Sequence, residues 1–352
     1  PGTQVTDKTE LRNLKGRIQT LLNRNQNSLT ERTEIKNFPG AQPISLAREH
    51  LERLNSDHFL VCEKSDGVRY LLFIPGSAAT GGIVDTYAFL IDRRYNFWRV
   101  RVSVPDRLLG RGDSIFDGEL VLDYGTELRF LIFDTLLSGG VAYIHNNFLE
   151  RLQIAFIELI YPIRLLGTAS KSAIELFLKD FYPTTEVDFL LNGVIKKKLL
   201  PHENDGLIFT EVKAPYVFKT TQHILKWKPP ELNTIDFIVR AEKSGGEVKF
   251  TLNTFNGSIP EFFDEIFFED EEEQAQVLKL LSEVSVLVLE CIYIESRWRV
   301  LKMRTDKDTA NATVVAKRIM ASILDNLTAE EIAARLTNAE PHARKIMKTG
   351  QE

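Results

Sequence analysis

A lysine between two apolar segments is the residue of this sequence whose position most favours covalent chemistry. Lys64 follows Phe59–Cys62 and precedes Tyr70–Ile74, and both segments predict buried strands. Between them Asp66-Gly67 predicts a tight turn, because aspartate can hydrogen-bond its own backbone and glycine accepts positive φ. Arg69 follows the turn and brings a fixed cation close to the lysine. We predict a hairpin with a nucleophilic lysine beside a phosphate-binding arginine; the alternative is an ordinary hairpin with a solvated lysine.

Further polar clusters accompany other predicted strands. Lys226 and Lys228 share one face of a strand, because side chains repeat every second residue, and such a pair suits a polyphosphate. We refer to these groups together as the polar clusters. In chain order they are Lys64-x-Asp66-Gly67-x-Arg69, Asp117-Gly118-Glu119, Phe133-Asp134, Asp205-Gly206, Lys226-x-Lys228, and a C-terminal cluster with Lys302, Arg304, Asp306 and Lys307.

The elements that must position these clusters mix helices with antiparallel strands. Residues 8–24 and 146–160 carry apolar side chains at helical spacing. Residues 114–123 and 128–137 predict strands, and residues 97–104 alternate apolar with polar side chains, which is typical of a strand with one solvated face. Because no glycine-rich loop joins a strand to a helix with Rossmann or P-loop spacing, we predict an α+β fold.

The chain length of 352 residues suits two domains. The double proline Pro229-Pro230 ends a predicted strand, and we place the boundary there, with residues 1–232 as the first domain and 233–352 as the second. Several short predicted strands in the second domain favour a small β-barrel, an OB fold, followed by C-terminal helices. These strands cover residues 235–241, 247–255, 284–294 and 298–304.

Composition limits the kind of protein and of ligand. The formal net charge of −5 means that an anionic ligand must be held by a local group of cations. No apolar run reaches membrane-spanning length. Cys62 and Cys291 lie far apart in apolar surroundings, which predicts buried free thiols in a reducing compartment, and two cysteines argue against a zinc site. The chain starts at Pro1 without a basic and apolar leader, so we expect that any signal is absent or removed.

Taken in order, the polar clusters resemble the covalent nucleotidyltransferase superfamily, which comprises mRNA capping guanylyltransferases and nucleotide-dependent DNA and RNA ligases. The resemblance covers residues from about 58 to 311. Three segments look like the capping branch: 205–210, 225–229 and 298–307. Lys302 stands where the capping pattern often has arginine, which would change a bidentate phosphate contact. The resemblance implies a fungal-type, monofunctional guanylyltransferase, with antiparallel sheets and flanking helices in a nucleotidyltransferase domain and an OB-fold domain after it.

For such an enzyme the resemblance implies that Lys64 attacks the α-phosphorus of GTP and forms lysyl-GMP. The 5′-diphosphate end of nascent RNA then takes the GMP and becomes a GpppN cap. The attacking amine must be neutral, so its pKa must fall from about 10.4. Partial burial and nearby cations are the two effects that we expect to lower it.

The resemblance also implies roles for the other clusters. Phe133 stacks on guanine, and Arg93 and Glu119 reach the ribose. Asp205 faces a divalent ion, Mg²⁺ or Mn²⁺. The alternatives are a core aromatic for Phe133, a turn residue for Asp205 and a charged barrel edge for the C-terminal cluster. The implied phosphate ligands are Arg69, Lys226 and Lys228 at the α-phosphate, and Lys302, Arg304, Asp306 and Lys307 at the β- and γ-phosphates once the second domain closes.

Two competing functions stay open on the sequence. One is an ATP-dependent polynucleotide ligase that works through lysyl-AMP, and the other is a catalytically silent scaffold that binds RNA or polymerase. No RNA triphosphatase signature is present, so we expect that activity on a separate polypeptide. Kinship implies a nuclear protein, without a membrane partner, that binds the phosphorylated C-terminal domain of RNA polymerase II. The basic residues between Arg93 and Arg101 are one docking candidate, or simply the solvated face of their strand.

Overall fold

The computed structural model describes residues 2–24, 38–56, 58–78, 81–167, 174–244, 247–305 and 307–337. The chain forms two compact units. The first unit comprises Pro1–Ile44, Glu52–Lys226 and Ala333–Glu352, and the second comprises Ser45–Leu51 and Trp227–Ile332. The domain boundary after residue 232 stays a prediction.

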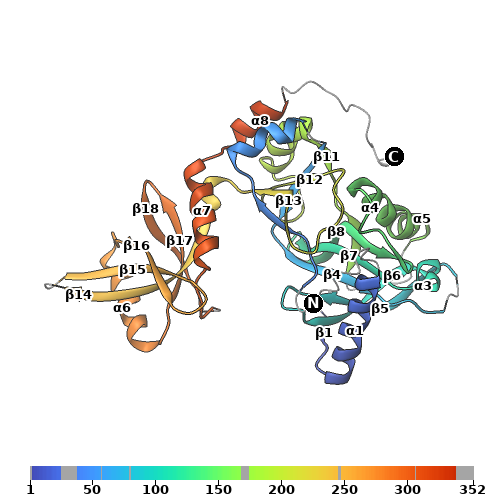
Figure 1. Ribbon diagram of the computed structural model, residues 1–352, viewed down its shortest axis with the longest axis horizontal. Helices are drawn as coiled ribbons and strands as arrows, with labels where there is room; N and C mark the ends of the chain where they lie inside the picture. Colours follow the sequence, from blue (N-terminus) through green and yellow to red (C-terminus); the bar gives the residue numbers. More distant parts are fainter. Residues whose placement is uncertain are drawn as a thin grey trace. The chain divides into compact units, whose positions relative to one another are not determined.

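A large sheet forms the centre of the first unit (Figure 1). Its neighbours pair antiparallel, except that β8 and β10 run parallel. The order is β1 (Thr3–Gln4), β6 (Phe97–Pro105), β5 (Ile83–Ile91), β4 (Val68–Ile74), β7 (Ser114–Asp123), β8 (Glu127–Ser138) and β10 (Glu175–Leu178), with β9 (Val141–Ala142) against β8.

Both faces of this sheet are covered by helices (Figure 1). Helix α1 (Lys8–Arg24), with the bounds that the leucine spacing predicts, packs Ile18 and Leu22 on one face against Leu71 and Phe73 of β4. The helix predicted at residues 146–160 is α4 (Phe148–Ala155) continued by a π-helical turn (Phe156–Ile160) and by α5 (Tyr161–Leu166). This helix covers the other face, where side chains of β4 alternate to Leu72 and Ile74.

A smaller sheet carries the lysine strand. Its order is β11 (Tyr182–Pro183), β3 (Phe59–Ser65), β12 (Asn204–Glu211), β13 (Thr220–Trp227) and β2 (Gln42–Ser45). The predicted hairpin is therefore wrong, since β3 pairs with β11 and β12 while β4 pairs with β5 and β7. Asp66-Gly67 carries the chain from one sheet to the other, and the N–H of Asp66 donates to the carbonyl of Glu203 at 2.9 Å. Lys64 consequently lies where the two sheets meet.

Short helices complete the described elements. They include α2 (Leu51–Ser56), α3 (Asp106–Arg111), a π-helical segment (Phe189–Ile195) and 3₁₀ turns at Arg48–His50, Thr184–Glu186 and Pro230–Leu232.

The second unit is a five-stranded antiparallel sheet with helices (Figure 1). Phe237 and Trp298 pack edge to face in its core, with ring centroids 4.9 Å apart. Among the described residues the strands at the two ends of the order do not pair, so the sheet is not a closed barrel, and the OB fold stays a prediction. The order is β16 (Pro260–Ile266), β15 (Glu247–Phe255), β14 (Thr234–Ser244), β17 (Val288–Ile294) and β18 (Arg297–Met303), and the helices are α6 (Glu271–Glu283) and α7 (Thr313–Asp325). Helix α8 (Ala329–Thr337) begins in the second unit and ends in the first.

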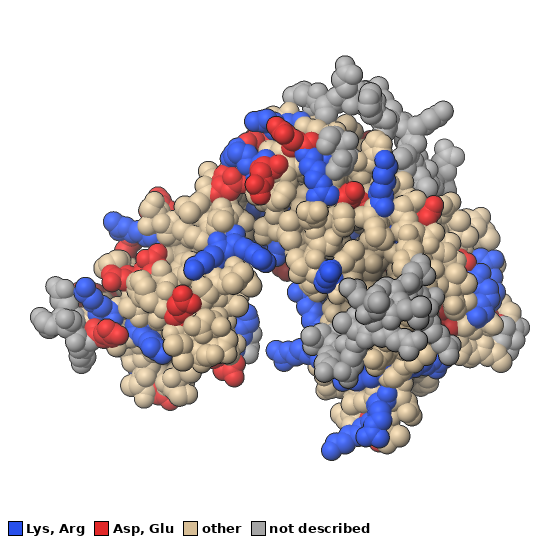
Figure 2. Space-filling view, in the orientation of Figure 1, with Lys and Arg blue, Asp and Glu red and all other residues tan. Residues whose placement is uncertain are grey.

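The predicted α+β class is confirmed by these mixed sheets and helices. Cys62 and Cys291 are buried free thiols, as expected, and burial raises the pKa of both. Within the described part of the chain, no helix has the length and apolarity needed to cross a membrane. In the face shown in Figure 2, cationic side chains form separate groups with acidic side chains between some of them. An anionic ligand at this face would therefore meet one local group of cations rather than a uniformly positive surface.

Candidate active site

Lys64 occupies the end of β3, where its side chain is only partly exposed. Its ammonium nitrogen donates to the Oδ1 of Asp205, which stands at the start of β12 on the neighbouring strand. The exposed fractions of the two side chains are 23% for the lysine and 15% for the aspartate. Lys64 therefore does not point into bulk water, and the structure brings together two residues that lie far apart in the sequence.

The neighbours of Lys64 on β3 belong to a buried ionic network. Glu63 and Ser65 both contact the ammonium group of Lys179, and His202 lies with its Nε2 3.3 Å from Glu63. The other ring nitrogen of His202 is 3.1 Å from Asp123. Burial alone would raise the pKa of Glu63, but Lys179 and His202 outweigh it and hold that pKa at about 2. The network fixes the strand that presents the lysine.

Arg69 is nearly buried in the adjacent sheet. Its guanidinium donates to both carboxylate oxygens of Asp117, at 2.9 and 2.6 Å, and to the carbonyl of Ala41 at 2.6 Å. The rings of Phe38 and Phe133 lie 5.5 and 5.4 Å from the guanidinium carbon. Burial would lower the pKa of Arg69, but the paired Asp117 raises it, so the cation is permanent. Its predicted contact with a phosphate stays a prediction.

Phe133 owes its position to an irregularity between β7 and β8. Asp117 pairs with Asp134, but the next residue, Gly118, pairs with Ile132, so Phe133 is the extra residue of a β-bulge. A bulge re-aims the side chain at that position. The half-buried ring of Phe133 therefore lies over Arg69.

Glu119 connects the charged residues electrostatically. Burial raises the pKa of its carboxyl to about 7, although Arg69, Lys179, Arg93 and Lys64 all act to lower it. All these cations are therefore close enough to interact with Glu119. The structure thus gathers Lys64, Asp205, Arg69, Phe133 and Glu119 at the junction of the two sheets.

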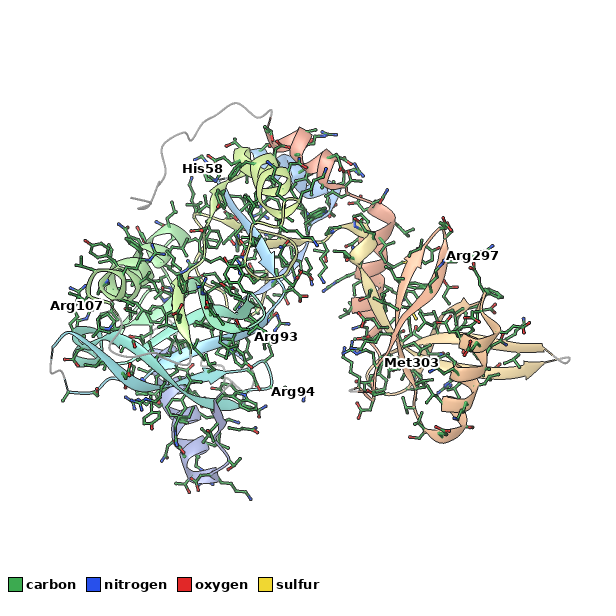
Figure 3. The ribbon with its side chains drawn as sticks, turned by 180° about the vertical axis from the view of Figure 1, so that it is seen from behind. His58, Arg93, Arg94, Arg107, Arg297 and Met303 are labelled. Carbon is green, nitrogen blue, oxygen red and sulfur yellow. The ribbon has the colours of Figure 1, made fainter. Side chains whose placement is uncertain are left out.

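Arg93 lies on the turn that joins the end of β5 to β6 (Figure 3). The carboxylate of Asp92 organises this turn by accepting from the N–H groups of Arg94 and Asn96, both at 2.9 Å. Partial desolvation and the nearby Arg69 lower the pKa of Arg93, while Glu119 raises it. Arg93 therefore belongs to the same electrostatic group.

Lys226 and Lys228 lie at and just beyond the end of β13. Lys226 stands between the buried Leu225 and Trp227, so it takes the opposite face of the strand. The Trp227 indole N–H donates to the carbonyl of Leu327 at 2.8 Å, which fixes the strand end.

The C-terminal cluster lies in the second unit, on β18 and just after it. Figure 3 labels the first and last residues of β18, Arg297 and Met303. Arg304 donates to both oxygens of the buried Asp236, at 3.1 and 3.3 Å, and Lys307 contacts the same carboxylate. Lys302 is exposed on β18. Asp306 lies outside the described residues.

Metal binding depends on Asp205. No group of three or more His, Cys, Asp or Glu side chains with metal-site geometry occurs in the described ranges. Mg²⁺ commonly binds one or two carboxylates together with substrate phosphates, and Asp205 beside Lys64 fits that mode. A divalent ion at this site would therefore need ligands from the substrate.

Several site residues were missed by sequence reasoning. Lys179 and His202 are isolated in the sequence, and no spacing connects them to Glu63. Tyr216, whose hydroxyl donates to Asp117 at 2.5 Å, likewise lies in an undistinguished segment. The sequence places Asp117 in one cluster with Glu119, but only the fold shows that Asp117 is buried and pairs with Arg69.

Known proteins resemble this chain over most of its length. Residues 1–230 match the family model "mRNA capping enzyme, catalytic domain", and residues 232–333 match "mRNA capping enzyme, C-terminal domain". The mRNA-capping enzyme subunit alpha of Schizosaccharomyces pombe is 32% identical, and the match covers 85% of that protein and 94% of this chain. The Neurospora crassa protein of that name is 33% identical, and the match covers 84% of that protein and 85% of this chain. A solved structure, "mycobacterial DNA ligase D complexed with ATP and MES", is 17% identical with a TM-score of 0.41, covering 76% of this chain and 95% of that one.

Proposed function

The chain belongs to the mRNA capping enzyme family, and from this premise we propose that it transfers GMP from GTP to the 5′-diphosphate end of nascent RNA through a covalent intermediate on Lys64. The observation that carries the proposal is the partly buried Lys64, held on Asp205 at the junction of two sheets. A solvated surface lysine would have neither a fixed direction nor neighbours that handle phosphate.

The proposed chemistry has two steps. In the first, the neutral Lys64 amine bonds to the α-phosphorus of GTP, the bond from that phosphorus to the oxygen bridging to the β-phosphorus breaks, pyrophosphate leaves, and the nitrogen releases one proton. In the second, an oxygen of the RNA diphosphate bonds to the same phosphorus, the nitrogen–phosphorus bond breaks, and the nitrogen takes up a proton. The products are a 5′-5′ triphosphate cap and a free lysine.

Asp205 and Lys64 must separate before the first step. The attacking nitrogen must be a neutral amine with a free lone pair, whereas in the structure the ammonium group of Lys64 donates to the carboxylate of Asp205. Asp205 would hold Mg²⁺ or Mn²⁺ together with phosphate oxygens of the nucleotide. When bound, such an ion supplies positive charge that stabilises the phosphate oxygens as the α-phosphorus is attacked.

The nucleoside would be held by the group around Arg69. We propose that Phe133 stacks on guanine, because the bulge turns its ring out of the regular strand pattern over a cation. Arg93 and Glu119 would hydrogen-bond the ribose hydroxyls, because the guanidinium of Arg93 donates and the carboxylate of Glu119 accepts.

The triphosphate would be held by fixed cations. In the proposal Arg69, Lys226 and Lys228 stabilise charge on the α-phosphate. Lys302, Arg304 and Lys307, with Asp306, act at the β- and γ-phosphates, where Arg304 and Lys307 would exchange Asp236 for phosphate oxygens.

The proposal extends to partners. The substrate RNA needs a 5′-diphosphate, and we propose that a separate RNA triphosphatase supplies it. A nuclear location and recruitment by the phosphorylated C-terminal domain of RNA polymerase II are proposed from kinship.

The proposal is tested by incubating the purified chain and a divalent metal salt with GTP labelled at the α-phosphorus. The label should remain on denatured protein, and Lys64→Ala and Lys64→Arg should not take it up. Labelling from α-labelled ATP instead would favour a ligase. GTP binding by a correctly folded wild-type chain without covalent labelling would favour a silent scaffold and contradict the proposal.

A further inference from the structure

A short basic turn lies close along the chain to Asp205. It consists of Lys196, Lys197 and Lys198, which follow the π-helical segment and are all exposed. Within the residues that the structure describes, none of the three ammonium groups takes part in an ion pair. The backbone of the turn is nevertheless fixed, because the N–H of Lys198 donates to Ile195 at 2.9 Å and that of Leu199 to Val194 at 3.1 Å. The turn therefore presents three uncompensated cations from a defined position.

The segment that follows the basic turn is attached to the candidate active site at successive residues. The carbonyl of Pro201 accepts from Tyr124 at 2.8 Å, His202 lies between Glu63 and Asp123, and Asp205 accepts from Lys64. The chain between Lys198 and Asp205 is all that separates the basic turn from the Lys64–Asp205 ion pair. Fully extended, that length reaches about 25 Å at most. The basic turn is thus held within a few nucleotides of the proposed reaction centre.

Tyr124, which donates to Pro201 in the segment after the basic turn, is an unusual residue for the turn in which it lies. It and Gly125 are the two central residues of the turn between β7 and β8, with φ values of 49° and 73°, and the N–H of Thr126 donates to the carbonyl of Asp123 at 3.0 Å. Asparagine, aspartate and glycine are favoured in such a turn, and a bulky residue at positive φ is uncommon. The Tyr124 ring is also 76% exposed, so burial does not compensate for the backbone conformation. A strained, exposed aromatic residue indicates a function other than stability.

An exposed aromatic ring beside uncompensated lysines is the combination that binds single-stranded nucleic acid. Bases stack on the ring, and the cations follow the phosphates without reading sequence. We propose that Tyr124 and the basic turn bind the RNA strand behind its reacting 5′ end. This inference rests on the proposed function, because that function makes RNA the acceptor. It assigns a binding surface to the second chemical step only.

The test uses variants of the full chain that separate RNA binding from folding. Lys196, Lys197 and Lys198 are changed together to alanine. Tyr124→Asn removes the ring but supplies a residue that the turn favours, so it should not unfold the protein. Tyr124→Phe keeps the stacking face. The matched control changes Lys8, Arg12 and Lys15, exposed on α1, to alanine, which removes the same charge and favours the helix.

Two measurements are made on each variant. One is covalent GMP labelling without RNA, which should equal wild type in all variants. The other is binding of a 5′-diphosphate single-stranded RNA at several salt concentrations. The lysine variant should bind at least about tenfold more weakly, with a salt slope lower by about 2, since each lost contact to a single strand removes about 0.7. Tyr124→Asn should also bind about tenfold more weakly with an unchanged slope, and Tyr124→Phe and the α1 control should match wild type.

Wild-type RNA affinity and slope in the lysine variant would overturn the inference, as would equal weakening by the α1 control. Failure of the proposed function is distinguishable, because it would appear as absent GMP labelling in the wild-type chain. RNA binding that still depends on the basic turn would in that case support the surface and reject the chemistry.

Discussion

At the scale of single residues, side chains alternate along β3, so that the proposed nucleophile points to one face of the strand and the residues of the buried ionic network point to the other. Lys64 faces Asp205, while its neighbours Glu63 and Ser65 face the buried Lys179. Removing one partner of a buried pair leaves an uncompensated charge, so the network resists local rearrangement. The backbone that carries Lys64, the proposed nucleophile, is therefore held in place.

Glu119 predicts a pH dependence of stability. The pKa of its carboxyl in the folded chain is about 7, above the ordinary value of 4.5, so between these limits the folded state binds more protons than the unfolded state. Stability contributed by this group must fall as pH rises through that interval. Glu119→Gln should remove this fall and be more stable than wild type at alkaline pH by on the order of 1–2 kcal/mol, allowing for partial exposure. Urea unfolding of both proteins across the interval measures it; parallel pH profiles would contradict the assignment.

At the scale of elements, the crossing between the two sheets depends on Gly67. A Cβ placed there would lie 2.4 Å from the backbone oxygen of Leu120 on β7. The main chain of β7 cannot move aside as easily as the end of a flexible side chain can. Gly67→Ala should therefore lower the free energy of unfolding by about 1–3 kcal/mol. It should also lower GMP labelling, because it displaces Lys64. Chemical unfolding and the labelling assay measure the two effects.

The control for that change is Gly16→Ala in α1, where a Cβ meets nothing within 4 Å. Alanine should stabilise this helix by about 0.5–1 kcal/mol and leave labelling unchanged. If Gly67→Ala behaved like Gly16→Ala, the crossing would not be as tight as described.

The sequence predicted individual elements better than their partners. The leucine spacing of α1 and the strands around Glu119 and Phe133 are local patterns, and they were predicted nearly to the residue. The hairpin at Lys64 was wrong because β3 and β4 are both buried on two faces, and an apolar run does not reveal which strand lies beside it. Lys179 and His202 were missed for the same reason, since only pairing of distant strands brings them to Glu63.

At the scale of the whole molecule, the proposed site residues are divided between two units. Arg304 and Lys307 of the second unit are paired with Asp236, and their proposed ligands are the phosphates that leave as pyrophosphate. These cations should therefore matter only for the first chemical step.

Arg304→Ala should slow formation of lysyl-GMP by about a hundredfold, as expected for loss of one charged donor. Transfer of GMP from the isolated intermediate to RNA should stay near the wild-type rate. Single-turnover measurements of each step give the two values. Arg299→Ala, which removes an exposed arginine of β18, the strand that precedes Arg304, is the control. Equal slowing of both steps would contradict the division of roles.

The most direct test of the central claim is to locate the nucleotide. The chain is incubated with GTP and a divalent metal salt, digested, and sequenced by mass spectrometry under conditions that preserve a phosphoramidate. The account predicts one GMP adduct, on the peptide that contains Lys64 and on that side chain. An adduct on Lys226, Lys179 or any other residue, or none in a folded chain that binds GTP, would contradict it.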